Sequence, residues 1–168
     1  AQVKEYENGD KYEGDLVDDK REGKGVLYFQ NGDKYEGDFK DDQMEGKGIF
    51  TFSNGDKYEG DFHANKKEGK GIFFYENNER YEGEFLGDKK EGLGVYYYFN
   101  GNKYEGNFKN DTMEGKGIYT VKDTNDIYEG DFVNGMIDGQ GIFHYGNGEK
   151  YEGNRRSEER RVGKECRS

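Results

Sequence analysis

The chain has 168 residues and a formal net charge of −11, and 38% of its residues are charged while 30% are hydrophobic. So few apolar residues exclude a single deep core, and no apolar run approaches the ~18 residues of a membrane-spanning segment. The composition alone would be typical of disorder. The 15 Tyr and 12 Phe argue against disorder, because aromatic side chains bury the largest area per residue. We therefore expect a thin aromatic core that is spread along the chain.

Internal repetition dominates the sequence. The tripeptide Tyr-Glu-Gly recurs at steps of 23 residues, with one step of 24. Its tyrosines and glycines define the repeats: Tyr12, Gly14, Tyr35, Gly37, Tyr58, Gly60, Tyr81, Gly83, Tyr104, Gly106, Tyr128, Gly130, Tyr151 and Gly153. A fixed period of this length is typical of stacked repeat proteins. We divide the array into a partial repeat 1–11, six full repeats over 12–150 and a partial repeat 151–154, and interpret it as a fragment of a longer array.

Each repeat predicts two strands, as the second one illustrates. Residues 35–39 (YEGDF) alternate apolar or small residues with acids, which indicates a half-buried strand. A polar stretch follows over 40–45, and then a second strand-like run over 49–52 (IFTF). The pair Asn54-Gly55 predicts a type I′ hairpin turn, which needs positive φ at both residues.

The glycines of each repeat need a steric reason. Gly37 lies between the Tyr and Phe of its strand, where a Cβ would fill the space of those rings. Gly46 and Gly48 flank the return into the second strand, and we expect both to supply positive φ. The chain contains 28 Gly and no Pro, which suits a nearly continuous ladder of backbone hydrogen bonds.

The hairpins are expected to pair edge to edge, because a lone two-stranded hairpin is marginal in water. The predicted fold class is all-β: an elongated single-layer antiparallel sheet of stacked hairpins. The extra residue of the fifth repeat lies in 122–126, where we expect a local bulge in the loop and no break in the array. The open edges of such a sheet predict that the chain can associate with itself.

The composition changes abruptly after the last repeat. Residues 155–168 are rich in Arg, Glu and Ser, and they resemble the translation of a sequencing-library adapter. We therefore expect this basic tail to be non-native read-through and leave it out of functional reasoning. It holds 6 basic and 3 acidic residues, so the array alone carries 20 basic and 34 acidic residues, a net charge of −14. Cys166 also lies there, and an array without cysteine fits a reducing compartment such as the cytoplasm.

The combination of Tyr-Glu-Gly-Asp-Phe, Glu-Gly-Lys-Gly-Ile and Asn-Gly, repeated over residues 1–154, closely resembles the MORN repeat (membrane occupation and recognition nexus). The resemblance implies a groove-like sheet of stacked hairpins. It also implies a scaffold that binds a helix or extended segment of a partner, peripheral at a membrane or the cytoskeleton. Phosphoinositide binding has been proposed for the family. Some members sit beside an enzyme such as a lipid kinase or a methyltransferase, so a regulatory repeat region of a larger enzyme is a further alternative.

Second-strand aromatic side chains are the candidates for binding a protein partner in a groove, and a long aromatic strip suits a helix or an extended peptide. The predicted groove residues are Tyr28, Phe50, Phe52, Phe73, Tyr96, Tyr98, Tyr119 and Phe143. The alternative interpretation is that most of these rings only pack one repeat against the next.

A membrane-lipid module is the competing hypothesis, since an anionic head group needs clustered basic residues. The candidates are Lys66, Lys67, Lys89 and Lys90, which occupy nearly the same position in two repeats. The net charge of −14 opposes this hypothesis, because anionic surfaces repel such a chain. The array also lacks the basic footprint that nucleic-acid binding requires.

Catalytic and metal-binding patterns are absent from the sequence. The two histidines, His63 and His144, lie far apart with no partners that suggest a triad, no phosphate-binding loop motif exists, and no Cys/His spacing suggests zinc. We predict no enzyme activity, no cofactor and no metal. The repeated acids form a predicted ladder on the polar face, and we expect cross-strand pairing with lysines, at Lys24, Lys47, Lys70 and Lys116.

Overall fold

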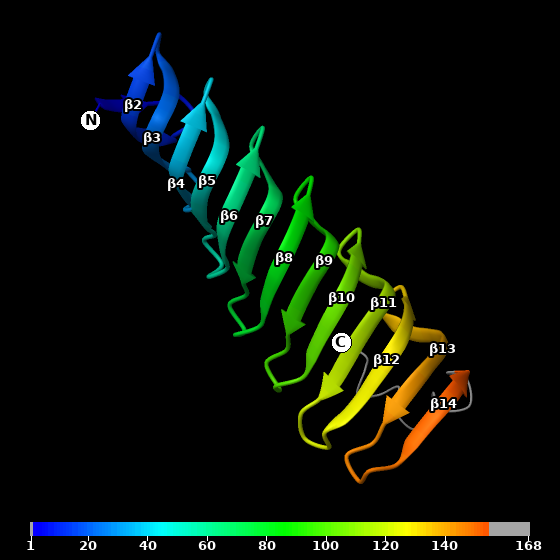
Figure 1. The fold of residues 1–168 in the computed structure, drawn as a ribbon. Coiled ribbons are helices and arrows are strands. Elements are labelled where there is room, and N and C mark those ends of the chain that lie inside the picture. The colour runs from blue at the N-terminus through cyan, green and yellow to red at the C-terminus, as the bar shows by residue number, and fades with distance from the viewer. Residues whose placement is uncertain (1, 155–168) are drawn as a thin grey trace. The chain divides into compact units, whose positions relative to one another are not determined.

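The computed structural model describes residues 2–154, which form strands joined by short loops (Figure 1). The strands are β1 (Gln2–Glu5), β2 (Lys11–Val17), β3 (Lys20–Tyr28), β4 (Lys34–Lys40), β5 (Gln43–Thr51), β6 (Lys57–His63), β7 (Lys66–Phe74), β8 (Arg80–Leu86), β9 (Lys89–Tyr97), β10 (Lys103–Lys109), β11 (Thr112–Val121), β12 (Asp126–Val133), β13 (Met136–His144) and β14 (Lys150–Asn154). Strand order in the sheet is chain order. The predicted all-β sheet of consecutive hairpins is confirmed. The predicted read-through tail, 155–168, lies outside the described residues.

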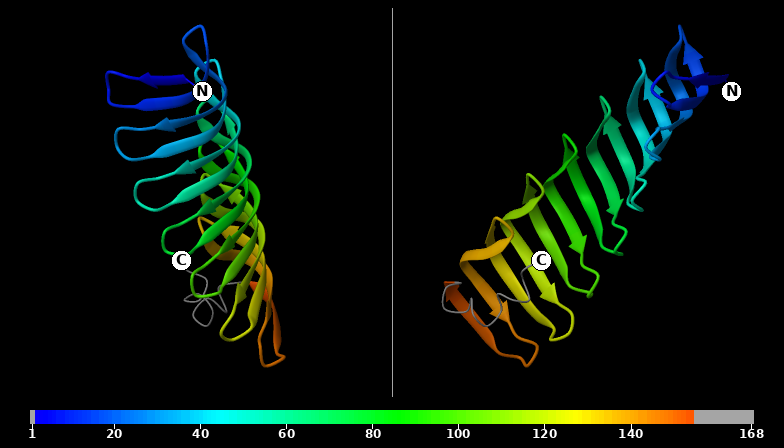
Figure 2. Two further views of the ribbon diagram at one scale, coloured as in Figure 1. Left: turned by 90° about the vertical axis from the view of Figure 1, so that its left-hand side faces the viewer. Right: turned by 180° about the vertical axis from the view of Figure 1, so that it is seen from behind.

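The chain divides into two compact units. Unit 1 comprises residues up to 77 together with 85–88, and unit 2 comprises 78–84 together with the residues from 89 onward. Strands β1 to β7 of unit 1 pair antiparallel, each with its neighbours in sequence, and so do strands β9 to β14 of unit 2. Figure 2 shows the successive hairpins of each unit from two further sides. Each repeat thus contributes one hairpin, as its alternating pattern predicts.

The hairpin turns lie elsewhere than the sequence predicts. In the second repeat β4 turns tightly into β5 through Asp41 and Asp42, with φ of 52° and 73°, so the polar stretch 40–45 contains this turn and the start of β5. Positive φ at both positions is the type I′ geometry that matches strand twist. The Asn54-Gly55 loop is wider, since Phe52 N donates to Asp56 O across it at 2.9 Å. Only the glycine there has positive φ, 104°, so the predicted type I′ turn is wrong.

The tight turns join each repeat to the one before it. Asp42 N donates to Arg21 O at 3.0 Å, and Asp42 Oδ1 accepts from Arg21 N at 3.1 Å. Gly135 N makes the first of these bonds, to Met113 O at 3.0 Å, and has no side chain for the second. The full pair recurs at Asn65, Asp88 and Asp111. A turn residue with a side-chain acceptor therefore fixes its own φ and also stabilises the contact between repeats.

A tyrosine ring explains the second glycine of each Gly-x-Gly. A Cβ at Gly48 would lie 2.3 Å from Tyr35 Cε1, far inside contact distance. The expectation of positive φ holds for Gly46, at 91°, and is wrong for Gly48, which is kept small by the ring above it. A Cβ at Gly37 would lie 2.4 Å from Lys47 O and 2.5 Å from Gly48 Cα, so the backbone of the neighbouring strand is the closest obstacle there, ahead of Tyr35 Oη at 2.9 Å.

The core is a file of rings in edge-to-face contact. Tyr35 is fully buried, and its ring centroid lies 5.0 Å from that of Phe39 in its own repeat and 4.9 Å from that of Phe62 in the next. Its hydroxyl donates to Asp38 O at 2.7 Å, and burial raises the pKa of Tyr35. Each such ring pair contributes about 0.5–1.5 kcal/mol beyond area burial. Half of these contacts join neighbouring repeats, so no hairpin has a complete core of its own.

The inserted residue of the fifth repeat lengthens the ladder by one residue pair. Val121 pairs with Asp126, and Tyr119 faces Tyr128 as Phe50 faces Tyr58 in the second repeat. The ladder gains one residue pair before a four-residue loop, 122–125, so the register of both strands is kept. The expectation that the insertion does not break the array is confirmed, whereas the expected local bulge is wrong, because β11 and β12 pair without a register shift.

Candidate functional site

The register places different side chains on the two faces of the sheet. Tyr35 lies opposite Leu27 and Phe50, whereas Glu36 lies opposite Val26 and Ile49. Since successive strand residues point to opposite faces, one face carries the ring core and the other carries the acids. We call them the aromatic face and the charged face.

In unit 1 the aromatic face carries five half-buried rings above the core, which we call the first aromatic row: Phe29, Phe50, Phe52, Phe73 and Tyr75. Neighbouring ring centroids along the row are 4.6–5.7 Å apart. A cavity of about 400 Å³ lies among three of these rings, with Met44, Phe62 and Lys67 also lining it. The row therefore offers a continuous, partly exposed apolar surface.

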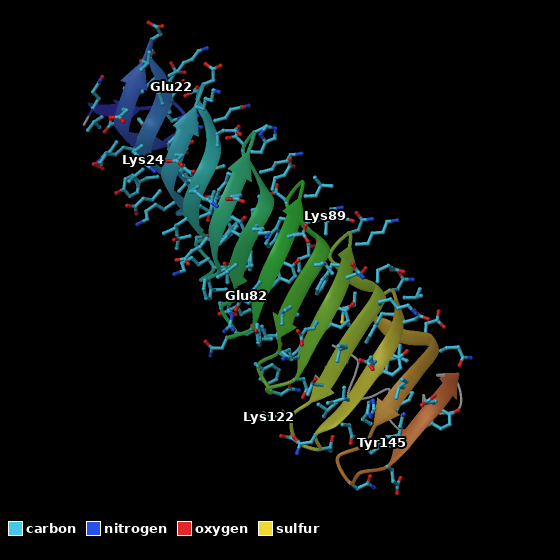
Figure 3. The ribbon with its side chains drawn as sticks, viewed as in Figure 1. Glu22, Lys24, Glu82, Lys89, Lys122 and Tyr145 are labelled. Atoms are coloured by element: carbon cyan, nitrogen blue, oxygen red, sulfur yellow. The ribbon has the colours of Figure 1, made fainter. Side chains whose placement is uncertain are left out.

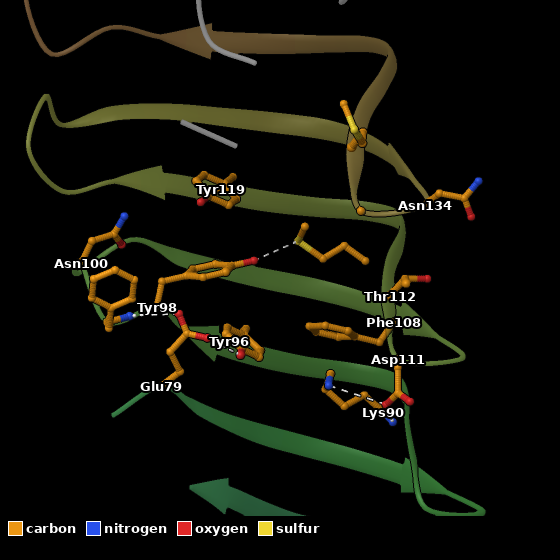
Figure 4. Close-up of a pocket in the computed structure, with 14 residues that line it drawn as sticks. Glu79, Lys90, Tyr96, Tyr98, Asn100, Phe108, Asp111, Thr112, Tyr119 and Asn134 are labelled. Atoms are coloured by element: carbon orange, nitrogen blue, oxygen red, sulfur yellow. Dashed lines mark hydrogen bonds and ion pairs between the residues drawn. The ribbon is translucent and has the colours of Figure 1, made fainter. Parts of the chain in front are cut away.

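In unit 2 the corresponding surface encloses a cavity of about 580 Å³ (Figure 4). Its lining includes Phe99, Phe108 and three tyrosines, Tyr96, Tyr98 and Tyr119, which we call the second aromatic row. Tyr96 Oη donates to Glu79 Oε1 at 2.6 Å, and Tyr98 Oη lies 3.6 Å from Met113 Sδ. Tyr119 is 2% exposed, so this wall is part of the core.

A buried amide supports the second aromatic row from below. Asn102 is 6% exposed, and its Nδ2 donates to Tyr119 Oη at 3.3 Å while its Oδ1 accepts from Lys122 N at 3.0 Å. Both polar ends of the amide thus have partners, as a buried polar group requires. In unit 1 the equivalent bond is made by a half-buried acid, since Asp56 Oδ1 accepts from Glu76 N at 2.9 Å.

The predicted groove residues do not share one surface. Tyr28 lies on the charged face, opposite Lys11 and Lys34, and is 40% exposed. The remaining members are on the aromatic face: Phe50, Phe52, Phe73, Tyr96, Tyr98, Tyr119 and Phe143. Phe143, like Tyr119, is 2% exposed. The predicted groove residues do not include Phe29 and Tyr75. Each lies two residues after one that faces a repeat Tyr, namely Leu27 and Phe73, so strand alternation would have placed both on the aromatic face.

The predicted lipid-contacting lysines alternate between faces. Lys67 is on the aromatic face, where its Nζ lies 3.3 Å from Asp88 Oδ1 and 5.6 Å from the Phe73 ring centroid. Lys90 Nζ lies 3.6 Å from Asp111 Oδ1. Lys66 is on the charged face opposite His63, and Lys89 is exposed at the edge of the sheet (Figure 3). Within each unit, therefore, the two adjacent lysines do not converge on one anion.

Ion pairs cover much of the charged face. Cross-strand pairing is confirmed for three lysines, and it joins Lys24 to Asp38, Lys47 to Asp61, and Lys116 to Asp131. Lys70 contributes its backbone N–H, which donates to Asp61 Oδ2 at 3.0 Å. Five of the seven glutamates of Tyr-Glu-Gly pair instead with the base two residues earlier on the same strand: Lys11–Glu13, Lys57–Glu59, Arg80–Glu82, Lys103–Glu105 and Lys150–Glu152.

Residues 2–154 offer neither a membrane-spanning helix nor a metal-binding cluster. No helix there is long and apolar enough to cross a membrane. No group of three or more His, Cys, Asp and Glu side chains is placed to hold a metal ion. His63 Nδ1 lies 2.7 Å from Glu45 Oε2, an exposed pair between neighbouring repeats that raises the pKa of the histidine.

Comparison with known proteins identifies the repeat. The model of the MORN repeat family matches six segments, at residues 12–34, 35–57, 58–80, 81–103, 104–123 and 128–150. A comparison with curated proteins gave no match. Among solved structures, the Drosophila melanogaster SAS-4 TCP domain, in complex with a proline-rich motif of Ana2, is 18% identical with a TM-score of 0.46, over 84% of this chain and 94% of that one.

A second solved structure is the TCP10 domain of Danio rerio CPAP, in complex with a STIL peptide. It is 12% identical with a TM-score of 0.39, over 89% of this chain and 76% of that one. Both likenesses are weak. The family match is different in kind, because its six segments follow one another over most of the sequence. This chain belongs to the MORN repeat family.

Proposed function

We propose that the chain is a non-catalytic repeat scaffold that binds an extended or helical segment of a protein partner on its aromatic face. One observation supports this most: five half-buried rings of the first aromatic row lie in contact along successive strands, beside a cavity of about 400 Å³. Contiguous exposed apolar surface of this kind marks interaction sites. On the family resemblance, we place such a scaffold in an assembly at a membrane or the cytoskeleton.

The available energy suits a peptide ligand. Aromatic side chains bury about 150–250 Å² each, and about a third or less of each ring in the row is exposed, so covering one ring removes at most about 50–90 Å² from water. At about 25 cal/mol per Å², each ring contributes at most about 1–2 kcal/mol. Five rings would supply at most about 5–10 kcal/mol before the cost of ordering the ligand, which suits a weakly bound peptide. The rings already contact one another, so little of their own freedom is lost on binding.

The test uses adjacent residues that point to opposite faces. Peptides selected from a display library against the full chain would be measured by fluorescence anisotropy with single variants. Phe50→Ala and Phe73→Ala should each weaken binding at least tenfold, whereas the neighbours Ile49→Ala and Phe74→Ala on the charged face should leave it unchanged. Circular dichroism confirms that each variant folds. Equal effects of the two members of each pair, or no selected peptide at all, would refute the proposal.

Lipid binding is a separate outcome of the same design. Phosphatidylcholine vesicles with and without a phosphoinositide would be pelleted with the full chain. The proposal predicts no phosphoinositide-dependent pelleting. Binding that disappears when Lys66, Lys67, Lys89 and Lys90 are all changed to Glu would replace the protein-binding proposal with the lipid one.

A further inference from the structure

We infer that the first aromatic row takes a proline-rich segment in the polyproline II conformation. The segment would run across the strands, with an apolar side chain at every third position and Lys or Arg among the others. This inference rests on the proposed function and names the class of partner for that site.

The backbone of unit 1 limits which conformations can lie on this face. Every strand from β2 to β6 is paired on both sides, so its backbone N–H and C=O groups are used in hydrogen bonds to the two neighbouring strands. A ligand crossing the face meets only side chains, Phe50 and Phe52 among them. An extended β-segment would leave its own backbone without ladder partners. Polyproline II needs no partners for its backbone, and an α-helix bonds its own.

Spacing separates these two conformations. Equivalent rings, such as Phe29 and Phe52, are one repeat apart, which is two strands or about 9.5 Å. Polyproline II advances about 9.3 Å in one turn of three residues, so over three repeats its contacts drift by less than about 1 Å. Two turns of an α-helix span about 10.8 Å, and over three repeats the drift is about 4 Å. One residue in three of a polyproline II segment can therefore meet an equivalent ring in each repeat.

Charge determines the remaining positions of the segment. The Asn-Gly loops adjoin the row, since Phe29 and Phe52 open two of them, and these loops carry Asp10, Asp33 and Asp56 without any Lys or Arg. These three acids accept backbone N–H bonds from the next repeat, and no base pairs with them among residues 2–154. A line of unneutralised carboxylates beside an apolar row is complementary to a segment with basic residues between its apolar ones.

The experiment measures three acetylated twelve-residue peptides against the full chain by isothermal titration calorimetry. The first repeats Leu-Pro-Lys, the second has the same composition with its leucines at irregular spacing, and the third repeats Leu-Pro-Glu. We expect the first to bind at least tenfold more tightly than either of the others. Asp33→Asn with Asp56→Asn keeps one oxygen acceptor at each position for the backbone N–H of the next repeat and removes two charges, and it should weaken the first peptide and reduce the dependence of its affinity on salt.

Each outcome has a distinct meaning. Phe52→Ala should weaken the first peptide at least tenfold, with Phe74→Ala on the charged face as its matched control. Equal affinity of the regular and irregular peptides would overturn the inference, and so would tighter binding of an amphipathic helical peptide of equal leucine content. In the latter case the proposed scaffold function would stand. That function fails only if library selection also yields no ligand for the aromatic face, so the two failures are distinguishable, and the peptide series remains decisive even if Phe52→Ala does not fold.

Discussion

The aromatic faces of the two units have cores of the same design and differ above them. Tyr35–Phe62 in unit 1 and Tyr104–Phe132 in unit 2 have the same ring separation, 4.9 Å, and nearly the same interplanar angle. Above this core, the first aromatic row is half-buried and four of its five rings are phenylalanines. In the second row all three rings are tyrosines, and Tyr119 is 2% exposed.

The difference shows which positions of the repeat are constrained. A core Tyr packs against the Phe of the next repeat and a core Phe against the Tyr of the repeat before it, so a change there disturbs an interface between repeats. The half-buried rings of the first row contact the protein over only part of their surface, so the residue type at these positions can change from one repeat to the next. The hairpin scaffold thus presents an apolar surface in unit 1 and a hydrogen-bonded cavity in unit 2.

The largest effect is expected where the units are alike. Gly48→Ala in unit 1 and Gly117→Ala in unit 2 each place a Cβ within 2.4 Å of a core tyrosine ring. Each should lower the free energy of unfolding by about 3 kcal/mol, because overpacking displaces the ring. Urea denaturation followed by circular dichroism measures this. Gly87→Asn is the control, since φ is 55° and no atom lies within 4 Å of its Cβ position. A loss well below about 3 kcal/mol in either core variant would contradict a core of the same design in both units.

A smaller effect should separate the units. Asn102→Ala leaves Lys122 N and Tyr119 Oη without their amide partner in a buried site, and we expect a loss of about 2 kcal/mol. Asp56→Ala removes the bonds from Glu76 N and Asn54 Nδ2 at a half-buried site, where water can replace the lost acceptor, and it should cost about 1 kcal/mol. Thermal unfolding at equal protein concentration compares them. Equal losses would show that the buried amide gives unit 2 no additional stabilisation.

The tight turns allow a reciprocal exchange. Asp42→Gly removes the acceptor for Arg21 N without straining positive φ, and the free energy of unfolding should fall by about 1 kcal/mol. Gly135→Asp, at φ of 80°, supplies the missing acceptor and should raise it by about 0.5 kcal/mol. Chemical denaturation of both variants gives the signs. Destabilisation by Gly135→Asp would mean that the acceptor does not reach Met113 N.

The smallest effect depends on pH and concerns unit 1. The hydrogen bond to Glu45 raises the pKa of His63 above its ordinary 6.5, and the bond to His63 lowers the pKa of Glu45 below its ordinary 4.5. The stabilisation of the folded state by this pair is therefore complete between about pH 4.5 and 6.5. It is lost as pH rises through the folded pKa of His63, and also as pH falls through the folded pKa of Glu45. The denaturation midpoint should be slightly higher at pH 6 than at pH 8. His63→Gln should remove this difference, and an unchanged difference would exclude the pair as its cause.

The repeat period, the strand alternation and the positions of the core rings could all be read from the sequence, because a repeated pattern gives the same local signal many times over. Tyr35, Gly37 and Phe39 were placed correctly for this reason. The turns could not be read correctly. Asp41-Asp42 is a weaker turn signal than Asn54-Gly55, and register with the preceding repeat decides which pair adopts the two-residue geometry. Tyr28 is wrongly predicted for the groove, because its residue type shows that it is aromatic but does not show on which face of the sheet it lies.

By itself, the sequence determined that this protein is a stack of β-hairpins whose tyrosines and phenylalanines share their packing across repeats, because burial of so few apolar residues requires neighbours. The tertiary structure decided which rings remain exposed, which lysines are already paired, and where acids line the aromatic row. Those outcomes depend on the face and register of each strand, and a shift of one residue would reverse them.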